Sequence, residues 1–296
     1  MNYLFEFPNL LRIDTTAIDT AVRSFAVSAE PVLDAIRGAL GGLVGLLLSF
    51  MKLIPWPFMI LLVVLLGWRV KKSLRHGLFY GALIFLIGAI GLWEMMLITL
   101  SVVIASVMIA LVIGIPIGIL ISGSERANSI IRPILDTMQT MPVFVYLIPA
   151  LLLFGTGSAS GVIATVIYAV VPVIRLTSLG IRQVDKEVVE AAKAFGSTRW
   201  QALAKVQIPQ ALPTIMTGVN QTLMMAMAMV VTTSMIGVRG LGMEVLNAVN
   251  RVEIGRGLLA GSSVVILAVI LDRLTQEAGT RGGRSAAKEG KLNGKQ

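Results

Sequence analysis

Residues 190–213 form a charged, helix-forming stretch between two long apolar segments, and their types suit contact with another protein. The stretch begins Glu190-Ala191-Ala192. A glutamate can make charge-assisted hydrogen bonds. Ala191 and Ala192 favour helix and carry almost no side-chain bulk, so another surface can approach the backbone closely. We therefore predict a docking segment. The alternative is a helical hairpin that contacts only its own chain.

The spacing in this stretch predicts two short helices held outside the membrane. An apolar stripe follows the i, i+3, i+4, i+7 pattern of one helix face, at Val188, Ala191, Ala192 and Phe195. Gly196 should end this helix in the left-handed conformation. Ser197 or Thr198 should cap the next. Pro209 and Pro213 are then expected to stop the second helix.

The sequence offers no catalytic, metal or cofactor chemistry of its own. His76 is its only histidine and it has no cysteine, so neither a Ser/His/Asp group nor a metal-ligand cluster can be assembled. The Gly-x4-Gly-Lys-Ser/Thr phosphate loop is also missing. We therefore expect no catalytic residue, no bound metal and no bound cofactor, and any ATP and magnesium would be held by a partner.

Composition indicates an all-α integral membrane protein. Hydrophobic residues make up 56% of the 296 residues and charged residues 14%, whereas soluble domains average about 25% charged. Seven apolar segments are predicted to cross the bilayer, at 54–68, 78–93, 95–121, 134–154, 159–177, 214–236 and 257–271. Within the third, Gly114 and Gly118 have the spacing that favours close helix contact.

The basic residues predict the orientation. They gather in the links after the first, third, fifth and seventh segments, which fall on one side if all seven cross; that side should be the cytoplasm, with the C-terminus. The net charge of +9 is explained in this way, and nucleic-acid binding is not expected. On the outer side, 237–256 is either a re-entrant hairpin, acting as a gate, or a plain loop.

Three regions are predicted along the chain. Residues 1–51 form an N-terminal segment whose amphipathic part, 31–51, lies in the membrane interface with the N-terminus outside; crossing by 38–51 would reverse that. Residues 52–276 form the transmembrane unit, with a cytoplasmic loop at 178–213. Residues 277–296 form a basic tail, predicted to be disordered.

Polar residues near membrane depth are candidates for lining a water-filled path, or for bonding helix to helix. Asp136 belongs to this group with less support. The candidates for a substrate path are Gln139, Met141, Phe144, Asn220 and Gln221.

The chain resembles a known family in four stretches. The spacing from Glu190-Ala191-Ala192 through Gly196, Val206 and Ile208 to Pro209 resembles the coupling loop of membrane subunits of ABC importers. Residues 135–142, 218–223 and 266–276 resemble the permease subunits of bacterial glycine betaine/proline betaine importers. The likeness covers most of 90–275.

The resemblance implies a type I ABC importer fold, with about seven spans, a five-helix core and a cytoplasmic coupling loop. It implies two copies of this chain, separate ATPase subunits and an extracytoplasmic substrate-binding protein, in the bacterial inner membrane. The residues that it assigns to ATPase coupling are Glu190, Ala191, Ala192, Phe195, Gly196 and Pro209. Choline, carnitine or an amino acid remain alternative cargoes, and an ion-coupled secondary transporter is a different alternative.

Overall fold

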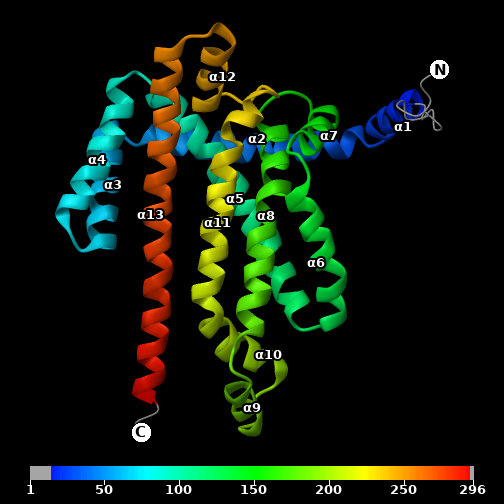
Figure 1. The fold of residues 1–296 in the computed structure, drawn as a ribbon, viewed down its shortest axis with the longest axis vertical. Helices are drawn as coiled ribbons and strands as arrows, with labels where there is room; N and C mark the ends of the chain where they lie inside the picture. Colours follow the sequence, from blue (N-terminus) through cyan, green and yellow to red (C-terminus); the bar gives the residue numbers. More distant parts are fainter. Residues whose placement is uncertain (1–14, 294–296) are drawn as a thin grey trace, which may run out of the picture.

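The computed structural model describes residues 15–293, and the side chains of 16–276 apart from Ile18. The described chain is almost entirely helical (Figure 1). The predicted position of the N-terminus and the end of the basic tail, 294–296, lie outside the described residues. In chain order the elements are α1 (Thr15–Ser28), α2 (Glu30–Leu53), α3 (Trp56–Lys71), α4 (Leu74–Ala89), α5 (Trp93–Ser122), α6 (Glu125–Thr140), α7 (Phe144–Phe154), α8 (Ser158–Arg182), α9 (Lys186–Ala194), α10 (Arg199–Ala202), the π-helix η1 (Leu203–Gln207), α11 (Ile208–Ser234), α12 (Leu241–Arg251) and α13 (Ile254–Asn293).

The centre of the molecule is formed by α5, α8 and α11, which pack against one another along their length. Glycines allow this closeness. A Cβ added to Gly114 of α5 would lie 2.4 Å from Val173 Cγ1, and one added to Gly118 would lie 2.8 Å from the carbonyl oxygen of Ile174. Both contacts are with α8. The predicted role of this glycine pair in close helix packing is therefore confirmed.

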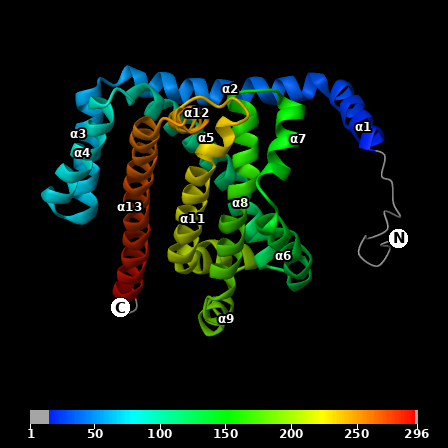
Figure 2. The ribbon, with the colours of Figure 1, turned by 45° about the horizontal axis from the view of Figure 1, so that its top comes forward.

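Helix α2 lies across one end of this bundle instead of running along it (Figure 2). Its length and composition would suffice for a span. However, Arg37 Nε donates a 2.8 Å hydrogen bond to the carbonyl oxygen of Phe154, where α7 ends. Lys52 Nζ lies 2.9 Å from Glu94 Oε1, where α5 begins. The helix is thus tied at two places to the same end of the molecule.

The predicted span at 134–154 is wrong as a single helix. It is divided between α6 and α7, which meet at an angle of 92°. Pro142 explains the break, because proline disfavours helical geometry at the residue before it, and Met141 is extended with φ −67° and ψ 135°. Within residues 15–276, five helices are long and apolar enough to cross a membrane, or six if this bent pair counts as one span.

Two of the seven predicted spans form a shorter hairpin. Helices α3 and α4 contain 16 residues each and so are about 24 Å long, less than the about 30 Å of a hydrocarbon core. They pack tightly through glycines. A Cβ on Gly77 would lie 2.3 Å from the carbonyl oxygen of Val64, and one on Gly81 would lie 2.4 Å from a Val64 methyl group.

The four basic links that the sequence predicts to share one side lie toward one end of the molecule. The tip of the α3–α4 hairpin, the α5–α6 link, α9 and the end of α13 all point away from α2 and α12 (Figure 2). The predicted boundary at 277 is not visible in the backbone, because α13 continues as helix to Asn293. Ala286, Ala287, Lys288 and Glu289 in that part are good helix formers.

Candidate functional site

Helix α9 is defined at both ends by hydrogen bonds that its own sequence supplies. At the start, Asp185 Oδ1 accepts a 2.9 Å bond from the N–H of Glu187. At the end, Gly196 has φ +85°, its N–H donates to the carbonyl of Lys193, and the N–H of Ser197 donates to that of Ala192. These two bonds around a left-handed glycine form a Schellman end. The predicted stop at Gly196 is confirmed.

The second helix begins with a reciprocal cap. Thr198 Oγ1 accepts from the N–H of Gln201 at 3.3 Å, and Gln201 Oε1 accepts from the N–H of Thr198 at 2.9 Å. Of the two predicted caps, Thr198 is therefore the one used. This bond pair fixes the direction in which the chain leaves the turn at Gly196.

The prediction that Pro209 and Pro213 stop this helix is wrong. Helix α10 continues through η1 into α11, so that the 36 residues Arg199–Ser234 are helical without a break. Pro209 lies in the first turn of α11, and just before it the N–H of Ile208 donates to the carbonyl of Leu203. This five-residue step is a π-turn, which lets the chain absorb a proline without ending the helix.

The apolar stripe of α9 has no cover from its own chain. No residue of α9 is buried, and the Phe195 side chain is 93% exposed. Trp200 at the start of α10 is 71% exposed. Glu190 is also exposed, and its side chain makes no hydrogen bond or ion pair within the described residues. Exposed aromatic side chains on a polar projection mark an interaction site, which favours docking over a self-contained hairpin.

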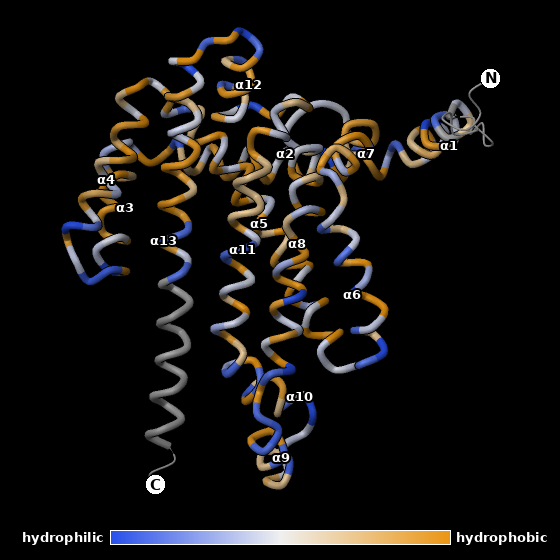
Figure 3. The backbone as a smooth tube through the Cα atoms, viewed as in Figure 1, coloured by the Kyte–Doolittle hydropathy of each residue, from blue (hydrophilic) through white to orange (hydrophobic). Residues whose placement is uncertain are grey.

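A groove of about 820 Å³ lies between α9, α10 and the neighbouring ends of α5 and α8. Glu190 and Trp200 line it, whereas Phe195 stands outside it. Its charged lining is mainly positive and consists of Arg182, Lys186, Lys193, Arg199 and Glu190. A partner surface with acidic groups would therefore complement the groove. Figure 3 shows this projection as the hydrophilic end of the molecule.

The predicted path residues fall into two groups. Gln139 is exposed near the end of α6, Met141 lies at the bend, and Phe144 is 52% exposed at the start of α7. Asn220 and Gln221 lie in the middle of α11, and Gln221 is exposed. Both α6 and α11 pack against α8. None of the five residues lines the groove beside α9 or the small cavity beside residues 235–241.

For Asn220 the structure shows the helix-to-helix alternative. Its Nδ2 donates to Asp272 Oδ1 at 2.8 Å, and its Oδ1 accepts from Thr275 Oγ1 at 2.6 Å. Both partners belong to α13. Because each end of the amide has a partner on α13, Asn220 joins α11 to α13.

One charged residue was missed from the sequence. Arg175 on α8 forms an ion pair with Asp136 on α6. A charge within a predicted span usually has a partner or a function, so Arg175 inside 159–177 was a signal. The pair holds α6 beside α8 just before the bend at Met141.

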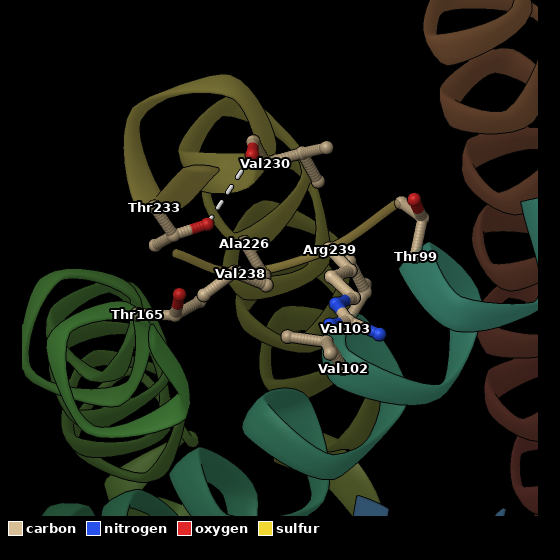
Figure 4. A pocket seen from close by; sticks show the side chains of 9 residues that line it. All are labelled: Thr99, Val102, Val103, Thr165, Ala226, Val230, Thr233, Val238 and Arg239. Atoms are coloured by element: carbon tan, nitrogen blue, oxygen red, sulfur yellow. Dashed lines mark hydrogen bonds between the residues drawn. The ribbon is translucent and has the colours of Figure 1, made fainter. Parts of the chain in front are cut away.

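The other end of the bundle is closed by residues 235–241 (Figure 4). The N–H of Leu241 donates to Thr99 Oγ1 at 2.8 Å, and the N–H of Gly157 donates to the carbonyl of Ile236 at 3.1 Å. Val238 packs where Gly161 leaves room for it. The cavity left beside it is about 10 Å³, enough for about one water molecule. The rest of 237–256 is mainly α12, so it is not a plain loop.

The family model described as "Binding-protein-dependent transport system inner membrane component" matches residues 114–276. The chain belongs to this family. It is accordingly the membrane subunit of an importer. The matched part runs from Gly114 in α5 into α13 and contains the whole α9–α10 segment, whereas α1 to α4 lie outside it.

Relatives of this inner membrane component agree with the assignment. The chain is 49% identical to the glycine betaine/carnitine transport permease protein GbuB of Listeria monocytogenes, over 83% of this chain and 89% of the relative. It is 45% identical to the glycine betaine/proline betaine transport system permease protein ProW of Escherichia coli, over 90% and 73%. It is 43% identical to the glycine betaine transport system permease protein OpuAB of Bacillus subtilis, over 88% and 92%.

The fold of this inner membrane component is also similar to that of a solved structure. A chain of the MetNI methionine ABC transporter matches with a TM-score of 0.54 and 23% identity, over 64% of this chain and 92% of that one. At this identity the likeness concerns the fold alone. It agrees with the predicted type I importer fold.

Proposed function

We propose that this subunit carries glycine betaine, or a related quaternary ammonium solute, in an importer driven by a separate ATPase. The proposal is supported by the names of three relatives that are 43–49% identical over most of the chain. The ATPase would bind ATP and magnesium, and an extracytoplasmic protein would deliver the cargo. The observation that carries the coupling role is the uncovered α9 stripe, held between two capped ends.

The unbroken helical segment Arg199–Ser234 would carry motion from the ATPase into the membrane. When the ATPase subunits close on ATP, each would push the α9–α10 segment that it holds. Helix α8 leads into α9, and α10 leads into α11, so both long helices would move together. Their glycine-mediated contacts leave little room for independent sliding.

Two copies of the chain would complete the path. Gln139, Phe144 and Gln221 are exposed in one copy, although each falls in a segment that the sequence predicts to span the membrane. Within a membrane, the two glutamine side chains would need water or protein against them. A second copy placed against α6, α7 and α11 would supply this and enclose a path between the two chains.

Uptake by reconstituted vesicles tests the proposed function. Vesicles that contain this chain, its ATPase and its binding protein should accumulate labelled glycine betaine only when ATP is supplied on the α9 side. Uptake driven by an ion gradient without ATP would contradict the proposal. Carnitine is the second candidate cargo, because the name of the 49% identical relative includes it. Competition by excess unlabelled carnitine distinguishes one cargo from two.

Replacing Phe195 by alanine tests the docking role separately from the cargo. Because Phe195 is 93% exposed, Phe195→Ala should leave the unfolding transition of the isolated chain unchanged. If this ring is an interface anchor, the affinity for the ATPase should fall about 30-fold. Val249→Ala is the matched control, since Val249 is 66% exposed on α12 at the other end. Equal affinities of both variants for the ATPase would remove Phe195 from the interface.

A further inference from the structure

The turn between α3 and α4 is strongly basic. Residues 69–76, which we call the hairpin tip, contain Arg69, Lys71, Lys72 and Arg75 and no carboxylate. The tip lies on the α9 side of the molecule but less far from α2 than α9 does (Figure 2). It lies outside the part matched by the family model.

The hairpin geometry brings these charges together and holds them in place. Only Lys72 and Ser73 separate the two helices, and Lys72 has a left-handed φ of 50°. Directly behind the tip, Gly67 and Gly77 are in contact, since a Cβ on Gly67 would lie 2.9 Å from Gly77 Cα. The cations are therefore presented on a narrow, firmly packed turn.

The sides of the hairpin are suited to lipid. Large apolar side chains between 40% and 59% exposed cover them, namely Leu61, Leu62, Leu65, Leu66, Leu78 and Phe79. Above the tip, Trp68 is 50% exposed, as is typical of a ring at the membrane interface. The hairpin is about 24 Å long, so the headgroup layer must come inward by several ångströms to meet its tip.

We propose that the hairpin tip binds the headgroups of anionic phospholipids in the leaflet on the α9 side. The positive charge of the tip complements a layer of phosphate or phosphatidylglycerol headgroups, and Lys72 and Arg75 are the two cations that we assign to this contact. The apolar sides of the hairpin accept the acyl chains of the same lipids. Helix α9 projects well beyond the level of the tip (Figure 2), and we expect an ATPase seated on α9 to leave the tip open to lipid.

Fluorescence of Trp68 measures lipid composition next to the tip. The chain has four tryptophans, and replacing Trp56, Trp93 and Trp200 by phenylalanine leaves only Trp68. Two nanodisc samples are compared, both made mainly of phosphatidylcholine. One contains a small fraction of brominated phosphatidylglycerol, and the other contains the same fraction of brominated phosphatidylcholine. Trp68 fluorescence should be quenched more strongly in the first sample than in the second. The enrichment of anionic lipid next to Trp68 should fall about five-fold for each cation removed. The double variant Lys72→Gln with Arg75→Gln should therefore nearly abolish this enrichment.

Two controls make the measurement specific. A variant that retains only Trp56, at the other end of α3, should show no preference for the brominated anionic lipid. Arg126→Gln with Arg132→Gln removes the same charge from α6 on the α9 side and should leave the Trp68 preference unchanged. A second measurement does not need the single-tryptophan variant to fold. In the chain with all its tryptophans, native mass spectrometry should show fewer retained anionic lipids after Lys72→Gln with Arg75→Gln.

Three results would overturn the proposal. The first is equal quenching of Trp68 by both brominated lipids. The second is a preference for anionic lipid that survives the loss of Lys72 and Arg75. The third is displacement of the anionic lipid by added ATPase, which would assign the tip to a protein partner. None of these results depends on the transported cargo, so they test lipid binding independently of the proposed function.

Discussion

The α5–α8–α11 bundle and the α9–α10 segment are shaped by opposite means. In the bundle, residues far apart in sequence meet at close range, as Gly118 of α5 meets Ile174 and Thr177 of α8. In the segment, every defining bond joins residues within five positions, as at Gly196 and Thr198. The bundle therefore depends on packing between helices. The segment depends on backbone geometry and leaves its side chains uncovered for another protein.

The largest effect that separates the two regions is expected at Gly118. In Gly118→Val, the added side chain would collide with the Ile174 carbonyl and Thr177, which lie 2.8 Å and 2.6 Å from an ideal Cβ. We expect the free energy of unfolding to fall by about 3 kcal/mol, measured by denaturant titration in detergent. Gly261→Val on α13 is the control, because nothing lies within 4 Å of its Cβ position. If both variants lost a similar free energy of unfolding, close packing of α5 on α8 would not be the cause of the loss in Gly118→Val.

A smaller and strictly local effect is expected at Gly196. Its Cβ would meet nothing within 4 Å, but its φ of +85° disfavours any side chain. Gly196→Ala should therefore cost about 1–2 kcal/mol at the end of α9. Faster hydrogen exchange of the α9 amides should show this loss, with unchanged exchange in α8. Asparagine tolerates the left-handed region better than alanine does. The α9 exchange rates of Gly196→Asn should therefore lie between those of the unchanged chain and those of Gly196→Ala. An alanine variant with normal α9 exchange would argue against the strained turn.

The smallest of the three effects is expected at the cap of α10. Thr198→Ala removes the oxygen that accepts from Gln201. The loss should be about 1 kcal/mol, again in local exchange and not in the global unfolding transition. Thr198→Ser keeps the hydroxyl group and should restore protection. If serine and alanine behaved alike, the hydroxyl bond would have no part in holding the segment.

This contrast also explains what could be predicted from the sequence. The end of α9 and the start of α10 were predictable because Gly196 and Thr198 act on their own neighbours. The long spans in α5, α8, α11 and α13 were predictable because their apolar runs are long. In each case the information lies within a few residues or in composition.

What was missed depends on contacts between distant residues or on proline geometry. The tie of Asn220 to Asp272 joins residues 52 positions apart, and the bond from Arg37 to Phe154 spans 117. No local pattern reveals such partners. The bend at Pro142 was hidden because hydropathy counts apolar residues and not the conformation that they allow. The prolines of α11 misled in the other direction: the π-turn at Leu203–Gln207 precedes Pro209, and Pro213 lies inside the continuing helix.

That π-turn has a consequence for how the family could change over evolutionary time. It contains one residue more than an α-helical turn needs. Removing one residue between 203 and 207 would turn the preceding helix by about 100° relative to α11, since an α-helix advances 3.6 residues per turn. The face that carries Trp200 would then point elsewhere, while the membrane-embedded part stayed in place. A one-codon deletion there would thus re-aim α10 and Trp200 relative to α11, while α9 kept its connection to α8.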